Sequence, residues 1–352
     1  MKPMRITIAD VARKAGVSAG TVDRVLHNRG EVSPASAQKV RKALDDLKFK
    51  PNVFASMLAS GQYSVIAALL PSFGEGSYWQ QIYDGYCKGA EQMASLNVKL
   101  NFFFFDATDV KSFLKACERL MESEPSAVAL SPIFKSESLL FTNSLHDKGI
   151  PYIYVDTKME DPNYFAFLGM PMYQSGYLCA ALLADGCAPE EMGRVALVGI
   201  DRNRRQQSDP TVARREGFND YMESHYPGCS VLHLNVSGSD SEANYRLLDD
   251  FFTAHPDVRK VVMLNSRIHL LGSWLSEHPC KDRRVIGFDC LEKNLDLLRD
   301  GFVNVLISQK ATEQSCQAVV LLANYLILKK IPERRDFYLH IDILTRFNIE
   351  NY

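Results

Sequence analysis

The stretch that decides the fold runs from Thr7 to Gly61 and reads TIADVARKAGVSAGTVDRVLHNRGEVSPASAQKVRKALDDLKFKPNVFASMLASG. Two short helical patterns flank a tight turn at Gly16, and a third helical pattern follows the loop formed by residues 28–30. This spacing predicts a helix-turn-helix, a module that presents its second helix to the major groove of DNA.

Hydroxyl side chains stand where each of these helices should begin. We expect Thr7 to cap the first helix, Ser18 to cap the second, and Ser33, followed by a proline, to cap the third. The apolar positions predicted to form the core of the first two helices are Val11, Ala12, Ala15, Val22, Val25 and Leu26.

The pattern changes after the third helix, which should end near Leu47. Pro51 interrupts the helical periodicity, and a brief helical segment follows at Val53–Ala59. A segment of this length is unstable alone in water. We therefore predict a helix-turn-helix domain over residues 1–50, a hinge helix and linker over 51–62, and a large body over 63–352.

Charge divides the chain at the same place. Residues 1–62 carry 11 Lys and Arg against 5 Asp and Glu, whereas the rest carries 29 against 37. A basic head on an acidic body is typical of a nucleic-acid-binding domain joined to a body that does not bind DNA. The alternative explanation is a helical head with a solvated basic face.

Length and composition indicate an ordinary soluble protein of two or three domains, at 352 residues and 46% hydrophobic content. No apolar run approaches the roughly 20 residues of a membrane helix. The N-terminus has no apolar region of the secretory type, so we expect no signal peptide. The eight cysteines form no C-x-x-C pair and are expected to be reduced thiols of a cytoplasmic protein.

The body alternates strand and helix patterns. Strands are expected at 65–70, 99–105, 127–131, 152–155, 195–199, 231–234, 261–264, 285–288 and 304–308, and helices at 79–96, 111–122, 139–148, 173–183, 213–225, 241–254 and 313–328. This alternation predicts parallel sheets covered on both faces, arranged as two doubly wound α/β lobes with a cleft between them. Ligands bind such sheets outside the carboxyl ends of the strands.

The N-terminal stretch closely resembles the DNA-binding domain of the LacI/GalR family of bacterial transcription regulators. The matching strings are TIADVARKAGVS, TVDRVLHN, VSPASAQKVRKALDDL and KPNVFASMLASG. The body resembles the periplasmic sugar-binding-protein fold that this family uses as its sensor, and it is closest to the ribose-binding type. The resemblance implies a cytoplasmic, homodimeric repressor whose affinity for double-stranded operator DNA is controlled by a sugar or sugar derivative.

By position, the resemblance places Ala19, Gly20 and Arg24 of the second helix against the DNA bases. An arginine at position 24 can bind guanine through two hydrogen bonds, and its alternative is a phosphate or solvent contact. Asp23 is unusual beside a polyanion, and it either accepts from a cytosine amino group or pairs with a neighbouring arginine. The other members of the predicted DNA-binding set are Thr7, Ser18, Thr21, Asn28, Asn52 and Leu58.

The hinge is the second DNA-contacting part that the resemblance implies. Leu58 matches the leucine that the family inserts into the minor groove, where an apolar wedge unstacks a base step and bends the duplex. We expect this segment to become ordered only when two subunits and DNA meet.

Eight residues of the body match the ligand-contacting positions of the family. Tyr78 and Trp79 are the paired aromatics that stack on the apolar face of a sugar ring. The polar set is Ser131, Asp156, Arg214, Asn265, Asp289 and Gln309, whose carboxylates, amides and guanidinium suit a ring of hydroxyls. Ser131 and Thr157 are shorter and Met172 is less polar than is common at these positions, which leaves the sugar open. The arginine in the set keeps an acidic sugar as the competing ligand.

Other chemistry finds no support in the sequence. Residues 16–20 fit the hydrolase pattern G-x-S-x-G, but that pattern requires a strand before the serine, and a helix is expected there. We find no zinc-protease, P-loop or dinucleotide-binding motif, and we expect no metal, no cofactor and no enzyme activity. A solute-binding protein and a sugar-acting enzyme remain the rival classes. Release of DNA by the effector is expected, with a co-repressor mode as the alternative.

Overall fold

The computed structural model describes residues 6–27, 30–49, 63–200, 210–280 and 282–351 of the chain. It forms two compact units, Met1–Gly61 and Gln62–Tyr352. The predicted hinge helix with Asn52 and Leu58, the loop residue Asn28 and the arginine-rich loop 202–205 lie outside the described residues.

The first unit contains the three helices predicted from the sequence, which are α1 (Ile8–Ala15), α2 (Ala19–His27) and α3 (Pro34–Asp46). Gly16 ends α1 in the left-handed conformation, at φ 65°, which glycine adopts without steric cost. The buried core of the unit consists of Val11, Ala12, Ala15, Val22, Val40 and Ala43, with Val25 and Leu26 half-buried beside it.

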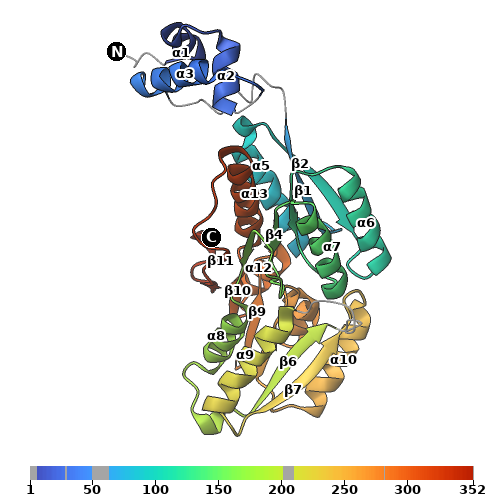
Figure 1. Ribbon diagram of the computed structural model, residues 1–352. Coiled ribbons are helices and arrows are strands. Elements are labelled where there is room, and N and C mark those ends of the chain that lie inside the picture. The colour runs from blue at the N-terminus through green and yellow to red at the C-terminus, as the bar shows by residue number, and fades with distance from the viewer. Residues whose placement is uncertain (1–5, 28–29, 50–62, 201–209, 281, 352) are drawn as a thin grey trace. The chain divides into compact units, whose positions relative to one another are not determined.

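The second unit consists of two α/β lobes. The sheet of the first lobe has the order β11-β5-β4-β3-β1-β2, and all of its strands are parallel (Figure 1). Its strands are β1 (Ser64–Pro71), β2 (Val98–Phe105), β3 (Ala127–Leu130), β4 (Tyr152–Val155), β5 (Ala166–Gly169) and β11 (Asp336–Tyr338). Its helices are α5 (Tyr78–Gln92), η1 (Ala94–Leu96), α6 (Val110–Glu122), α7 (Lys135–Asp147) and α13 (Ala311–Leu328).

The second lobe repeats this plan with the sheet order β12-β10-β9-β8-β6-β7, in which only β12 runs antiparallel to its neighbour. Its strands are β6 (Arg194–Ile200), β7 (Ser230–Val236), β8 (Lys260–Met263), β9 (Arg284–Phe288), β10 (Val305–Ser308) and β12 (Asp342–Leu344). Its helices are α8 (Met172–Ala184), η2 (Pro189–Glu191), α9 (Pro210–His225), α10 (Ser241–Ala254), η3 (Ile268–Leu271), α11 (Gly272–Glu277), α12 (Glu292–Arg299) and η4 (Ile349–Asn351).

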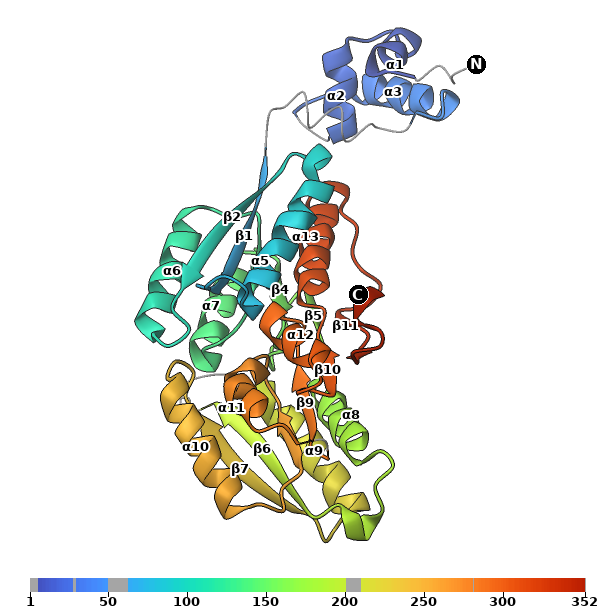
Figure 2. The ribbon, with the colours of Figure 1, turned by 180° about the vertical axis from the view of Figure 1, so that it is seen from behind.

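Helices cover both faces of each sheet, as the buried apolar strands require. In the first lobe α6 and α7 lie on one face while α5 and α13 lie on the other, and in the second lobe α10 faces away from α8 and α9 (Figures 1 and 2). Alternate residues of one strand serve the two faces. Ala196 and Val198 of β6 pack toward α10 and α11, whereas Val195 and Leu197 pack toward α8 and α9.

The chain passes between the lobes three times, after β5, after β10 and after β11. Each passage is two or three residues long, namely 170–171, 309–310 and 339–341. Because of the second passage, α13 packs against α5 and the sheet of the first lobe although it follows the strands of the second. The short passages bring the carboxyl ends of the two sheets together.

All nine predicted strands are present, and the prediction of two doubly wound lobes is confirmed. β5, β11, β12, α11 and α12 were not predicted from the sequence. α7 starts at Lys135, four residues before the predicted start, and α9 starts at Pro210, three residues before it. Within the part of the chain that the structure describes, no helix is long and apolar enough to span a membrane.

Candidate functional site

The helix-turn-helix presents one face of α2 to solvent. Ala19, Gly20 and Arg24 are exposed, while Val22 points into the core and is fully buried. Asp23 is half-buried on the same helix. The three residues that the resemblance places against DNA bases therefore lie where a groove could reach them.

Two predicted DNA-binding residues have a structural role within the unit. The Thr7 hydroxyl accepts a hydrogen bond from the Asp10 amide at 3.3 Å, and the Asp10 carboxylate accepts from the Thr7 amide at 3.0 Å, which forms a capping box. The Ser18 hydroxyl accepts from the Thr21 amide at 3.1 Å. These bonds cap the first turns of α1 and α2, as predicted from the sequence.

Gly20 has no structural reason to be glycine. A methyl group added at this position would meet nothing nearer than the Ser18 hydroxyl, at 3.9 Å, and the backbone does not adopt a positive φ. The fold would accept alanine there. An exposed glycine that the fold does not require suits a surface that another molecule approaches closely.

In the second unit, a cavity of about 220 Å³ opens between the lobes. Its lining contains six of the eight residues predicted to contact an effector, namely Tyr78, Trp79, Asp156, Arg214, Asn265 and Gln309. Ser131 and Asp289 are buried but do not line it. The lining residues that the sequence analysis did not single out include Glu75, Ser77, Arg267, His269 and Lys293.

The first lobe contributes a buried tyrosine–aspartate pair. The Tyr78 hydroxyl, at the start of α5, donates to Asp156 Oδ1 at 2.5 Å. Burial raises the pKa of Tyr78 well above its ordinary value, and the Asp156 carboxylate adds to this effect. The neighbouring Trp79 is half-buried and meets Tyr78 edge to face, with 5.2 Å between ring centroids.

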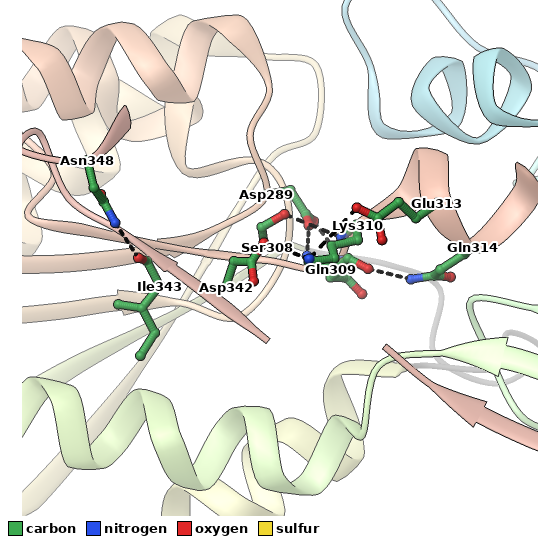
Figure 3. Close-up of polar contacts among 9 residues, drawn as sticks. All are labelled: Asp289, Ser308, Gln309, Lys310, Glu313, Gln314, Asp342, Ile343 and Asn348. Carbon is green, nitrogen blue, oxygen red and sulfur yellow. Dashed lines mark hydrogen bonds and ion pairs between the residues drawn. The ribbon is translucent and has the colours of Figure 1, made fainter. Parts of the chain in front are cut away.

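The second lobe contributes a carboxylate–amide pair (Figure 3). Gln309 binds Asp289 twice, through its side-chain amide at 2.6 Å and its backbone amide at 3.2 Å. The Gln314 side chain donates to the Gln309 carbonyl at 2.7 Å and fixes this segment further. Burial raises the pKa of Asp289 to about 6, although Arg214 and Gln309 both favour the ionised carboxylate.

Arg214 is the charged centre of the site and is 2% exposed. Its guanidinium donates to the Leu264 carbonyl at 2.8 Å and to the Ser175 hydroxyl at 3.2 Å, and it stacks over the Phe288 ring at 4.2 Å. Burial lowers its pKa, while the carboxylates of Asp289 and then Asp156 act in the opposite direction. A buried cation is tolerated because it has hydrogen bonds and two nearby anions.

The two aspartates occupy equivalent places in the two lobes. Asp156 directly follows β4 and Asp289 directly follows β9, and both adopt the left-handed backbone conformation, at φ 75° and 66°. Each backbone amide donates to the strand next in order, to Leu168 for Asp156 and to Ile307 for Asp289. Non-glycine residues rarely adopt this conformation, and they cluster at functional sites.

The geometry of the cavity is suited to binding a polar ligand. The polar groups of the cavity are amides, hydroxyls and paired charges, which orient a polar ligand. Among the residues that the structure describes, no three His, Cys, Asp or Glu side chains gather in a way that could hold a metal ion.

Comparison with protein families gives two matches. The family described as "Periplasmic binding protein domain" matches residues 66–330, and the family described as "Bacterial regulatory proteins, lacI family" matches residues 7–52. Among curated proteins, catabolite control protein A of Staphylococcus xylosus is 33% identical over 255 residues, which cover 72% of each chain. The transcriptional regulator RegA of Clostridium acetobutylicum is 29% identical over 180 residues.

The extent of these matches varies. The alignments span 29% of the length of the regulator MalR of Streptococcus pneumoniae and 50% of the length of RegA. Among solved structures, a protein described as a LacI transcriptional regulator from Bacteroides fragilis has a TM-score of 0.77 and 32% identity. It is covered completely and covers 83% of this chain. A glucose-galactose binding protein, GanP from Geobacillus stearothermophilus, has a TM-score of 0.69 at 18% identity, with 82% and 99% of the two chains covered, and so shares the fold.

Proposed function

The chain belongs to the LacI family of bacterial regulatory proteins, and from this premise we propose a transcription regulator that senses a sugar or sugar derivative in its cleft. The observation that carries the ligand part of the proposal is a pair of buried polar atoms that belong to residues lining the cavity. Gln309 Oε1 and Ser77 Oγ belong to cavity-lining residues, are buried, and have no hydrogen-bond partner among the described residues. A buried polar atom without a partner costs about 1–3 kcal/mol, which a ligand hydroxyl would offset.

The aromatic wall and the amides complete a site for a polyhydroxy ring. Tyr78 and Trp79 offer apolar ring faces and edges, and Asn265 and Gln309 offer groups that can donate to or accept from hydroxyls. Asp289 supports the ligand indirectly, because it holds the Gln309 amide. Ser131 lies outside the cavity lining, and its place in the effector set is the weakest of the eight.

Charge favours a neutral ligand over an acidic one. The Arg214 guanidinium is occupied by the Leu264 carbonyl and the Ser175 hydroxyl, and two carboxylates lie near it. The cationic groups of the lining are Arg214, Arg267 and Lys293, against Glu75 and Asp156 in the lining and Asp289 behind it. Three cations and three carboxylates leave no net charge to attract an anion.

The DNA part of the proposal rests on the head. A homodimer would place two α2 helices in successive major grooves of a near-palindromic operator, in the cytoplasm, with Asn52 and Leu58 contacting the backbone and minor groove between them. Effector binding would change the arrangement of the lobes and release the DNA, so that the protein acts as a repressor and carries out no catalysis. The size of this response is limited by the difference in effector affinity between the two arrangements.

Base contact by Arg24 is tested with full-length protein and a palindrome selected from random DNA. Arg24→Ala should weaken binding to the selected site by about 1–3 kcal/mol and relax the preference at one base pair. Arg13→Ala is the matched control, since Arg13 is an exposed arginine on α1 that lies beside Asp10. DNA affinity is measured by fluorescence anisotropy. An equal loss of affinity in the two variants would show that Arg24 contributes only its charge.

The ligand class is tested by calorimetry of the full chain against neutral, acidic and phosphorylated sugars. We expect a neutral sugar to bind, and Trp79→Ala and Gln309→Ala each to weaken it by more than about tenfold, the factor that corresponds to 1.4 kcal/mol. Gln92→Ala, an exposed change at the end of α5, should leave affinity unaltered. Failure of every sugar to bind would refute the ligand assignment and leave the DNA-binding assignment standing.

A further inference from the structure

One hydrogen bond spans the cleft beside the cavity. The Gln81 side-chain amide, on α5 of the first lobe, donates to the Cys290 carbonyl of the second lobe at 3.0 Å. Gln81 lies one helical turn after Tyr78, and Cys290 is the residue after Asp289. The bond therefore joins the aromatic side of the cavity to the loop that carries the buried carboxylate of the opposite lobe.

Gln81 is held on a rigid support. The Gln81 carbonyl accepts a hydrogen bond from the Thr312 hydroxyl of α13 at 3.2 Å. Farther along the same helix pair there is no room for side chains, because a methyl group at Gly85 would lie 2.2 Å from the Thr312 carbonyl oxygen, and one at Gly89 would lie 2.7 Å from that of Cys316. Two helices in backbone contact move as one body, so a movement of the lobes would break the Gln81–Cys290 bond rather than bend α5.

A second polar contact joins the lobes at the passage from β10 to α13 (Figure 3). Lys310 follows Gln309 there in the left-handed conformation, at φ 56°. Its ammonium group lies 3.0 Å from Asp342 in β12 of the second lobe and 3.7 Å from Glu313 in α13, which packs on the first lobe. The Lys310 side chain is only 18% exposed, so solvent screens these pairs less than surface pairs.

We propose that Gln81 and Lys310 are positioning residues that form an interlobe latch and favour the closed arrangement of the two lobes around the cavity. Neither belongs to the predicted effector-contacting set, and both act through groups that effector would not need to touch. The consequence for affinity rests on the proposed function, because a ligand that binds the closed arrangement loses apparent affinity in proportion to the fraction of open protein. Loss of either contact should raise the ratio of open to closed protein about fivefold to tenfold, as expected for one hydrogen bond.

The test measures the distance between the lobes in the full chain, without sugar and without DNA. Spin labels are attached through ketone-bearing amino acids at Leu140 on α7 and Leu247 on α10, both exposed, because eight cysteines make thiol labelling unselective. Pulsed dipolar spectroscopy then gives the distribution of distances. Gln81→Glu removes the donor at constant size, and Gln81→Leu is a second variant should the new carboxylate disturb the fold.

Matched controls separate the latch from general effects of substitution. Gln92→Glu makes the same change at the exposed end of α5. Lys310→Met is compared with Lys158→Met, because Lys158 pairs at 2.6 Å with Asp336, the first residue of β11, within the first lobe only. We expect longer distances in the Gln81 and Lys310 variants and wild-type distances in both controls.

The outcomes distinguish the latch from the proposed function. Wild-type distance distributions in folded Gln81→Glu, Gln81→Leu and Lys310→Met would overturn the latch, even if a sugar binds the wild-type protein. Longer distances in these variants would establish the latch even if calorimetry finds no sugar ligand. Longer distances in the controls as well would also overturn it, because the opening would then not depend on the contacts between lobes.

Discussion

At the scale of single residues, the raised pKa of Asp289 should make the folded protein more stable when this carboxyl is protonated. Burial raises its pKa from 3.8 to about 6, so the folded protein binds this proton more tightly than the unfolded chain does. Protonation therefore stabilises the fold. The contribution is complete below the pKa of the unfolded chain and is lost as pH rises through about 6.

Asp289→Asn should remove this dependence, because an amide does not ionise. We expect the melting temperature of wild type relative to the variant to fall as pH increases from about 4 to about 7, the window set by the two pKa values. Scanning calorimetry of both proteins across this range is the measurement. Asp250→Asn, at an exposed position on α10, is the control and should run parallel to wild type. A parallel curve for Asp289→Asn would contradict the expectation.

The family resemblance gave the eight residues of the effector set, and six of them line the cavity, but it did not indicate how they contact one another. The family resemblance singled out Tyr78, Asp156 and Asp289, and the structure places them where a helix begins or directly after a strand. Asp289 holds Gln309 behind the cavity through a contact between side chains 20 residues apart. No local sequence pattern predicts such a contact. The same holds for Arg214, whose partners Ser175 and Leu264 are 39 and 50 residues distant.

At the scale of elements, α8 and α9 cross in backbone contact next to Arg214. A methyl group at Gly176 of α8 would lie 1.8 Å from the Arg214 carbonyl oxygen, and one at Gly217 of α9 would lie 2.0 Å from the Tyr173 carbonyl oxygen. These distances are far shorter than van der Waals contact between non-bonded atoms, so the two helices would have to move apart. Gly176→Ala should lower the free energy of unfolding by about 1–3 kcal/mol, the usual cost of overpacking.

The same substitution should also reach the site, because the helix that moves carries Arg214. We expect weaker sugar binding in calorimetry together with an earlier transition in urea. Gly228→Ala is the control, since no atom lies within 4 Å of the added methyl group and the backbone does not adopt a positive φ. Gly176→Ala with wild-type stability would mean that the two helices are not in contact in solution.

Elements were predictable where the sequence repeats a pattern often enough. β1 and β6 are long apolar runs and stood out, whereas β11 and β12 are three residues each, too short for any period to show. These strands form because neighbouring edges accept them, at β5 and at β10. The antiparallel direction of β12 follows from its short connection to β11 across the lobes, which the sequence did not indicate.

At the scale of the whole molecule, the contrast between a basic head and an acidic body should separate the two proposed binding activities in their response to salt. Raising salt from about 50 to about 200 mM should weaken operator binding steeply, because neutralised phosphates release counterions. Binding of a neutral sugar should change little, since a neutral ligand is held by hydrogen bonds and releases no counterions. Fluorescence anisotropy for DNA and calorimetry for sugar, on the same protein preparation, measure both responses.

If the affinity for a neutral sugar derivative is the same at low and high salt, this result serves as the internal control, because it shows that salt does not alter the fold. Effector affinity that falls in parallel with DNA affinity would instead identify an anionic ligand and contradict the assignment to neutral sugars.

At this scale the sequence was informative, because charge asymmetry and strand–helix alternation are summed over many residues. The three passages between the lobes escaped it, since two or three residues leave no pattern.

The three passages also determine the order in which the protein can be completed as it leaves the ribosome. The helix-turn-helix is contiguous and can fold as soon as it emerges. The first lobe cannot be completed early. Its helix α5 packs against α13, whose Thr312 lies 231 residues after Gln81, and its sheet is completed only when β11 has been made. During most of synthesis the glycine face of α5 and the part of the sheet that α13 covers therefore lack that helix as a partner. The nascent first lobe, rather than the second, is the part of this chain that we expect chaperones to hold.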